Sequence, residues 1–198
     1  MTSPITAAPR STADARRARV VREAVTVFAR QGYHATPVTD VADAAGISQA
    51  YVFRLFAGKL GLFVAAVDEC YAQIVRALSD GANRTDGQSP AELLDGMGAV
   101  YADLIADRDL LMVQVHAQSA SDVPEIRDAV RRGYGSLLTF ARERSGASDP
   151  ELQQFIARGQ LCHLIVTADL DAVDAGWARA LTAGMRHPDQ TTRGGDST

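Results

Sequence analysis

The chain has 198 residues, of which 46% are hydrophobic and 6% aromatic, and its formal net charge is −4. This length and apolar content suit a globular protein of one domain, or of two small ones, with a proper core. No apolar run approaches the roughly 18 residues of a membrane span, and the N-terminal residues lack the apolar segment of a signal peptide. Composition therefore favours a cytoplasmic protein with no membrane partner.

The charge is distributed unevenly along the chain. Residues 1–60 contain eight Lys and Arg against four Asp and Glu, a net charge of +4, whereas residues 61–198 contain 12 against 20, a net charge of −8. A basic N-terminal part on an acidic remainder is typical of a polyanion-binding head on a non-binding body. A merely solvated charged surface would give the same asymmetry, so this observation alone leaves both interpretations open.

The N-terminal part is predicted to be helical after a short tail. Residues 1–10 are expected to be disordered, and residues 11–14 resemble a capping box with an acid in the first turn. The helix that follows should end at Gly32. Its buried stripe consists of Val21, Ala24, Val25 and Phe28. The arginines near its start either reach a phosphate backbone or merely increase solubility; they are Arg16, Arg17 and Arg19.

The stretch from Thr36 to Lys59 predicts a helix-turn-helix. Thr36 is a suitable N-cap with Pro37 at the first helical position, and Gly46 suits the left-handed residue that ends the helix. The apolar face of this helix consists of Val38, Val41, Ala42 and Ala45. Ser48 is expected to cap a second helix over 49–56. The residues expected to face inward from it are Val52, Phe53 and Phe56. In this motif the second helix enters the major groove of DNA.

Within this stretch the segment GISQAYVFRLFAGKLGLF resembles the signature of the tetracycline-repressor (TetR) family. With the preceding helix, the resemblance covers roughly residues 15–65. Four positions depart from the commonest family pattern, namely Ala50, Phe53, Leu55 and Leu60. Because Phe53 and Leu55 each remove a phosphate contact, the resemblance implies an altered affinity or contact pattern for DNA.

The candidate DNA-binding residues are Thr36, Ser48, Gln49, Ala50, Tyr51, Arg54 and Lys59. Gln49 lies at the N-terminal end of the second helix, where its amide can pair with adenine, and Tyr51 can rest against a thymine methyl. Arg54, Lys59 and Thr36 suit phosphates, the last two because they lie at helix N-termini. The alternative is an ordinary polar surface with no partner.

From Lys59 onward the sequence predicts helices only, so the fold class is all-α. A long helix should run from Lys59 to Leu78 or Gly81, followed by a turn-rich linker over 80–89. Further helices are expected from Pro90, from about Asp109, from Pro124 to about Ser145, and from Glu151 to Ala168. A last helix, capped by Asp171 or Asp174, should carry Trp177, and residues 187–198 should form a frayed tail.

Polar and polarisable side chains lie among the apolar positions of this body. The candidate contacts of an unknown small-molecule effector are Met97, Tyr101, Met112, His116 and Tyr134, with Gln114 beside them. A lone buried histidine is more often a core residue with one hydrogen bond, and Met or Tyr at helical spacing is more often packing. The TetR resemblance implies that some pocket exists in this part of the chain.

The last two predicted helices have apolar surfaces broader than one stripe. Such helices form either a central core or an oligomer surface. The TetR resemblance implies that two long helices pair with their symmetry mates in a twofold dimer. The candidate interface residues are Phe155, Gly159, Cys162, Trp177 and Leu181.

The cysteines and histidines give no catalytic or metal-binding pattern. Cys70 and Cys162 are far apart, and the adjacent Cys162 and His163 would point about 100° apart on a helix, so they cannot act together. The other histidines show no spacing that suits a metal. We therefore expect no enzyme activity, no metal and no cofactor.

These patterns predict two parts, a helix-turn-helix DNA-binding domain over 11–58 and an effector-binding and dimerisation bundle over 59–186. The resemblance implies a ligand-responsive transcriptional regulator, most often a repressor in this family, that binds a palindromic operator in double-stranded DNA as a homodimer. The long helix from Lys59 would transmit effector binding to the head. The alternative is a small-molecule sensor or binding protein whose head no longer binds specific DNA.

Overall fold

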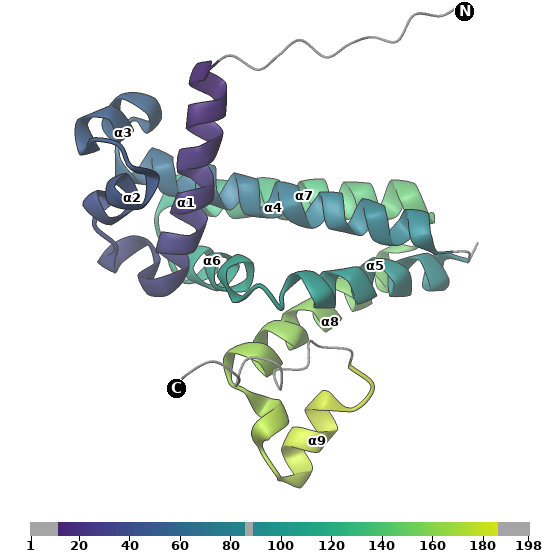
Figure 1. Ribbon diagram of the computed structural model, residues 1–198. Coiled ribbons are helices and arrows are strands. Elements are labelled where there is room, and N and C mark those ends of the chain that lie inside the picture. The colour runs from purple at the N-terminus through teal and green to yellow at the C-terminus, as the bar shows by residue number, and fades with distance from the viewer. Residues whose placement is uncertain (1–11, 86–88, 186–198) are drawn as a thin grey trace, which may run out of the picture.

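The structure, a computed structural model, describes residues 12–85 and 89–185, and within these ranges it contains helices and no strand (Figure 1). In chain order the elements are α1 (Thr12–Ala35), α2 (Val38–Ala45), α3 (Gln49–Phe56), α4 (Lys59–Arg84), α5 (Pro90–Leu104), α6 (Arg108–Ser119), α7 (Pro124–Ser145), α8 (Asp149–Thr167), the 3₁₀ turn η1 (Leu170–Ala172) and α9 (Gly176–Thr182). The predicted all-α fold is confirmed. The predicted tails at 1–10 and 187–198 lie outside the described residues.

The head consists of α1, α2, α3 and the first turns of α4. Val41 of α2, Val52 of α3 and Phe63 of α4 are fully buried in the same core as Phe28 of α1. The rings of Phe28 and Phe63 meet edge to face with their centroids 4.8 Å apart, a favourable arrangement for aromatic pairs. α2 ends at Gly46 in the left-handed conformation, as predicted.

α4 is the central helix of the molecule and packs against α1, α3, α5, α6 and α7. Figure 1 shows α4 and α7 side by side, with α1 crossing them at one end and α5 below. α8 passes beneath α5 and leads to η1 and α9, which lie on the side away from α2 and α3. Ile74 and Leu78 of α4 and Leu137 of α7 belong to the same core as Phe28, so one hydrophobic core joins head and body.

Gly32 interrupts α1, in agreement with the prediction that the first helix ends there. Its φ of 71° and ψ of −171° are not helical, and the chain kinks at this residue. The kink lies against His116 of α6, whose Nε2 is 3.2 Å from the carbonyl oxygen of Ala29. A Cβ atom at position 32 would be 2.7 Å from Nδ1 of His116, so only glycine lets α1 and α6 approach this closely.

Most predicted helix starts in the body are confirmed because their caps are local. Ser89 and Glu92 form a capping box in front of Pro90, and α7 runs from Pro124 to Ser145 as expected. The predicted linker over 80–89 is wrong in its first half, because α4 continues to Arg84. There Thr85 Oγ1 donates to the carbonyl of Gly81 at 2.9 Å, which satisfies one of the last carbonyls of the helix.

Three other local predictions are wrong. The N-cap of α2 is Pro37, not Thr36, and no side chain caps this helix. Phe53 is 45% exposed rather than buried, because an eight-residue helix turns only a narrow stripe inward, here Val52 and Phe56. The last helix, α9, has only seven residues and begins after Ala175 without a side-chain cap, so neither predicted aspartate starts it.

No single helix in the described part of the chain is long and apolar enough to cross a membrane. α3 and α4 pass the length and composition test only as a pair, across a bend of 67°. Among residues 12–85 and 89–185, no group of three or more His, Cys, Asp or Glu side chains is placed to hold a metal ion.

Candidate nucleic-acid interface and internal cavity

α3 has one buried side and one exposed side. The Ser48 hydroxyl oxygen accepts a hydrogen bond from the amide of Tyr51 at 3.3 Å, so the predicted cap and the start of this helix are confirmed. Val52 and Phe56 face the core, which leaves Gln49, Ala50 and Arg54 exposed on the opposite side. The N-terminal end of α3 thus presents an amide and, one turn on, a guanidinium to solvent.

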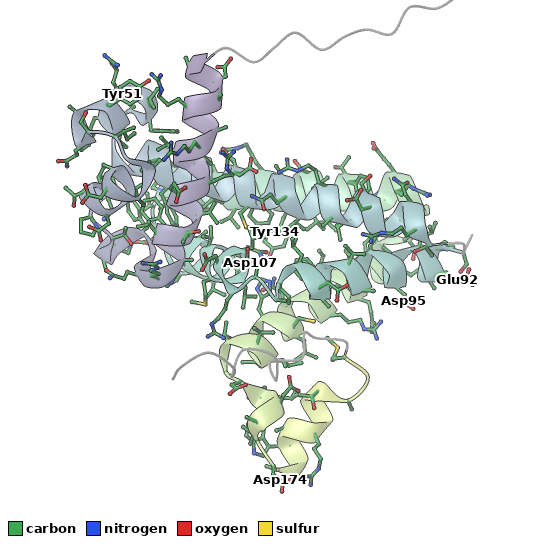
Figure 2. The ribbon with its side chains drawn as sticks, viewed as in Figure 1. Tyr51, Glu92, Asp95, Asp107, Tyr134 and Asp174 are labelled. Carbon is green, nitrogen blue, oxygen red and sulfur yellow. The ribbon has the colours of Figure 1, made fainter. Side chains whose placement is uncertain are left out.

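Tyr51 connects α3 to the N-terminal half of α1, and Figure 2 shows it at the outer tip of the head. Arg16 donates from Nη1 to the Tyr51 hydroxyl at 3.4 Å, and this hydrogen bond lowers the pKa of Tyr51. The guanidinium of Arg54 lies over the Tyr51 ring, 4.6 Å from its centroid, and that of Arg17 lies 4.7 Å from the centroid of Phe56. The arginines of α1 therefore share one basic surface with α3.

The sequence did not assign these arginines to the site. Arg16 and Tyr51 are 35 residues apart, and helical periodicity within one segment carries no information about a contact with another helix. The available signals were only the excess of basic residues near the start of α1 and the charge asymmetry of the chain.

Two of the predicted phosphate donors are placed differently from the exposed residues of α3. Thr36 is 2% exposed, and its Oγ1 is buried without a hydrogen-bond partner in the described structure, so it is not presented to a phosphate. Lys59 donates from Nζ to the carbonyl of His34 at 3.0 Å and lies 5.2 Å from the Tyr33 ring centroid. Partial burial lowers the pKa of Lys59. In this conformation Lys59 joins the start of α4 to the end of α1.

α4 begins very close to the end of α3. A Cβ atom at Gly61 would lie 1.8 Å from the carbonyl oxygen of Phe56, which no other residue could accommodate without moving the backbone. The orientation of α3 is therefore set directly by α4, the helix that also enters the body.

A cavity of about 400 Å³ lies in the body among α4, α5, α7 and α8. Most of its wall is apolar, with contributions from Ile74, Leu78, Leu94, Leu137, Phe155 and Ile156. Its volume is within the range of small-molecule sites. Arg158 of α8 and Asp95 of α5 also line it, with 3.2 Å between Nη1 and Oδ1, and both side chains are more than half exposed, so this ion pair lies where the cavity meets solvent.

One polar group in the cavity wall is centred on Tyr101. Its hydroxyl oxygen is 2.5 Å from Nε2 of His163 and 3.4 Å from Oε1 of Gln114, whose amide donates to the carbonyl of Leu110 at 3.2 Å. Burial raises the pKa of Tyr101 and lowers that of His163 to about 4, so both groups are uncharged at neutral pH. His163 was not among the predicted site residues, since its partner is 62 residues away.

A second polar group in the wall is centred on Tyr134, which Figure 2 shows between the α4–α7 pair and α5. Its hydroxyl oxygen accepts hydrogen bonds from Nε2 of Gln118 at 2.9 Å and from Nε2 of Gln160 at 2.7 Å. Burial raises the pKa of Tyr134, so the phenol keeps its proton.

Of the predicted effector contacts, only Tyr101 and Tyr134 line this cavity, as does Gln114. Met97 is fully buried in the core, Met112 packs against that core, and His116 contacts the kink in α1. The difference between the predicted contacts and the cavity lining has one physical cause. Helical periodicity distinguishes inward from outward positions, but it does not distinguish a core from a cavity.

The predicted interface residues also separate into two groups. Phe155, Gly159 and Cys162 line the cavity, so these positions of α8 face the interior of this chain. Trp177 is 59% exposed and Leu181 is half-buried, and Leu164 of α8 is 48% exposed. Trp177 and Leu164 are the large apolar side chains that α8 and α9 turn outward.

The chain matches the family described as bacterial regulatory proteins, tetR family, over residues 20–66. Its fold is similar to FadR from Bacillus subtilis in complex with stearoyl-CoA (17% identity, 83% of this chain and 94% of that chain covered, TM-score 0.65). It is also similar to FadR from Bacillus halodurans (20% identity, 85% of this chain and 99% of that chain covered, TM-score 0.64). A TetR-family regulator from Agrobacterium tumefaciens is similar as well (18% identity, 88% of this chain and 96% of that chain covered, TM-score 0.64). No curated protein matches the chain.

Proposed function

Since residues 20–66 match the family described as bacterial regulatory proteins, tetR family, we propose that the chain is a ligand-responsive repressor that acts in the cytoplasm. In this proposal it binds a palindromic operator in double-stranded DNA as a homodimer. The observation that carries the proposal is the exposed side of α3, where Gln49, Tyr51 and Arg54 lie together on a helix whose start Ser48 fixes.

The residues of this surface have different roles in the proposal. Gln49 reads a base edge, because its amide can donate to and accept from adenine, and such a pair contributes about 1–3 kcal/mol of discrimination. Arg54 and Arg16 bind phosphates on either side of Tyr51 and contribute affinity without sequence preference. Thr36 has no role while it stays buried, and Lys59 acts chiefly by fixing α4 to α1.

The exposed apolar side chains on α8 and α9 support a homodimer. α9, which carries the exposed Trp177, lies on the side of the molecule away from α2 and α3, so a twofold interface there would leave both heads free (Figure 1). Two heads are required for the two half-sites of a palindrome, about 34–36 Å apart or a multiple of that distance. We place the interface around Trp177, Leu164 and Leu181.

The response to a ligand follows from the position of α4. Ile74 and Leu78 line the cavity, and the first turn of the same helix holds the end of α3 through Gly61. A ligand that binds better to one tilt of α4 shifts the population toward that tilt and changes the spacing of the two α3 helices. The stearoyl-CoA complex of the similar FadR structure supports a small-molecule site in a protein of this fold.

A gel-shift assay with the DNA that flanks the gene tests this function. Specific retardation should survive competitor DNA at moderate salt. Gln49→Ala should lower the preference for the operator over other DNA, whereas Arg54→Ala should weaken binding to all sequences and reduce the salt dependence. Gln153→Ala on α8, which is exposed and outside the head, is a matched control that should change neither.

Two outcomes would contradict the proposal in different ways. If Gln49→Ala and Arg54→Ala change specificity equally, the proposal that Gln49 reads bases and Arg54 binds phosphates is wrong. Absence of specific retardation together with ligand-induced thermal stabilisation would favour the second candidate, a small-molecule sensor without specific DNA binding. The 45% exposure of Phe53, an apolar ring beside the DNA-facing side of α3, is the observation in favour of that candidate.

A further inference from the structure

We propose that Tyr51 is a specificity-determining residue whose hydroxyl donates a hydrogen bond to a guanine in each half-site of the operator. Arg16 positions the hydroxyl for this contact. The inference rests on the proposed function of the exposed side of α3 as a DNA-binding surface. It adds a base that this surface reads beside the one read by Gln49.

Tyr51 is held at its backbone, at its ring and at its hydroxyl. Its amide donates to Oγ of Ser48 at 3.3 Å, which places the residue in the first turn of α3. The hydroxyl oxygen accepts from Nη1 of Arg16 at 3.4 Å, and the guanidinium of Arg54 lies over the ring, 4.6 Å from its centroid. These contacts restrain the rotamer of Tyr51 at the outer tip of the head (Figure 2), so less conformational freedom is lost when it meets DNA.

The neighbours of the Tyr51 hydroxyl leave its proton available. A phenol accepts hydrogen bonds at its oxygen and donates one proton, whereas a guanidinium has donors and no acceptor. In the described part of the chain, the side chains that bond to this hydroxyl are those of Arg16 and, to a smaller extent, Arg54, and both lower the pKa of Tyr51. Because neither arginine can accept the phenolic proton, an acceptor on the DNA would complete the hydrogen bonding of this hydroxyl.

A donor with these neighbours distinguishes guanine from the other bases in the major groove. Guanine presents two acceptors there, N7 and O6. Adenine N7 lies beside the N6 amino group, and thymine O4 lies beside the amino group of its paired adenine. The guanidinium groups of Arg16 and Arg54 attract O6 and repel the partial positive charge of an amino group. Tyr51 therefore prefers guanine, rather than the thymine methyl group that the sequence analysis expected it to contact.

Arg16 can position Tyr51 and still bind a phosphate, because its guanidinium has further N–H donors beside the one that bonds to the hydroxyl. Its neighbour Arg17 provides an internal comparison. The guanidinium of Arg17 lies 4.7 Å from the centroid of Phe56, and it is not among the groups that bond to Tyr51 in the described structure. The two arginines therefore carry the same charge on the same helix, and only Arg16 holds the hydroxyl.

The test begins with operators that the full-length protein selects from a random DNA library at moderate salt. Each guanine of the selected half-site is then changed singly, and affinity is measured by gel shift without effector. Replacement of G·C by A·T exchanges O6 for an amino group, whereas replacement of guanine by hypoxanthine removes only the minor-groove amino group. At one guanine per half-site, we expect A·T to weaken binding about 2- to 10-fold, as for one hydrogen bond between neutral groups. Hypoxanthine at that position should bind like guanine.

Variants assign this preference to the hydroxyl. Tyr51→Phe keeps the ring and removes the donor, so it should bind the G·C and A·T operators with nearly equal affinity. Arg16→Gln should reduce the preference for G·C in the unchanged chain and should not reduce it further in Tyr51→Phe, as expected of a residue that acts through the hydroxyl. Arg17→Gln should weaken both operators alike. Tyr33→Phe, at the other end of α1, is the matched control and should change neither affinity.

The results that would overturn this inference leave the proposed function intact. One is a preference for G·C that is unchanged in Tyr51→Phe. Another is a preference for A·T that depends on Tyr51 and is lost when thymine is replaced by uracil, because the ring would then read the thymine methyl group. Equal loss of the preference in Arg16→Gln and Arg17→Gln would refute the positioning role of Arg16. Selection of no sequence above background would instead overturn the proposed function, and the inference with it.

Discussion

Substitution of Gly32 by alanine tests the contact between α1 and α6. The backbone at Gly32, with φ 71° and ψ −171°, lies in a region that is nearly restricted to glycine. The new Cβ would also lie 2.7 Å from Nδ1 and 2.9 Å from Cγ of His116. The imidazole would have to move, and its hydrogen bond with the carbonyl of Ala29 would be lost.

The expected loss of stability can be worked from these contacts. Backbone strain of this kind costs about 1–3 kcal/mol, and the lost hydrogen bond and repacking cost about 1–2 kcal/mol more. Alanine also reduces the conformational entropy of the unfolded chain, which offsets somewhat less than about 1 kcal/mol of this loss. We therefore expect Gly32→Ala to lower the free energy of unfolding by about 2–4 kcal/mol.

Urea denaturation at one fixed protein concentration measures this change, because a dimer would make the midpoint depend on concentration. In a His116→Ala background the collision is absent, so Gly32→Ala should there cost only the strain less the offset from the unfolded chain, about 1–2 kcal/mol. Gly135→Ala on α7 is the matched control. It is helical and exposed, nothing lies within 4 Å of its Cβ position, and it should be neutral or stabilising by up to about 1 kcal/mol.

Two results would refute this reasoning. If Gly32→Ala is as stable as the unchanged chain, the conformation at the kink does not require glycine. If its cost is the same with and without the His116 side chain, the close contact between α1 and α6 contributes nothing, and backbone strain alone explains the loss.

Three further predictions concern other parts of the molecule. Burial lowers the pKa of His163 from 6.5 to about 4, so between these pH values the unfolded chain binds a proton that the folded chain does not bind. The free energy of unfolding should therefore fall by up to about 3 kcal/mol between pH 6.5 and 4. His163→Gln should flatten this slope in urea titrations at several pH values. Trp177→Glu should convert the proposed dimer to monomer in light scattering while helix content by circular dichroism is unchanged; a dimer that persists would place the interface elsewhere. Ser89→Ala removes the capping box of α5 and should cost about 1 kcal/mol in thermal unfolding, and no loss would show that the cap is dispensable.

Features that depend on neighbouring residues could be predicted from the sequence. Ser48 before α3, Pro90 at the start of α5 and Gly46 after α2 act within one helical turn, and each is found where expected. The helix-turn-helix could be predicted for the same reason, since its apolar positions and its turn lie within a short segment.

Features that depend on contacts between distant segments could not be predicted. His116 and Ala29 are 87 residues apart, so a histidine that fixes the kink in α1 was interpreted as a ligand contact. Tyr101, a predicted effector contact, lines the cavity, but the sequence offers no sign of its partner His163, which is 62 residues away. Phe53 was expected inside because a short apolar run does not show which of two adjacent residues faces the core.

The single core that joins Phe28 to Leu137 limits how this protein can be divided. The predicted boundary after residue 58 divides the proposed DNA-binding role from the proposed ligand-binding role, yet a cut there would leave Phe28 without Phe63 and the Ala29 carbonyl without His116. We therefore expect the two parts to unfold as one cooperative unit rather than as interchangeable modules. A hybrid regulator that borrows this head for a different sensor must also carry over the facing surfaces of α4 and α6.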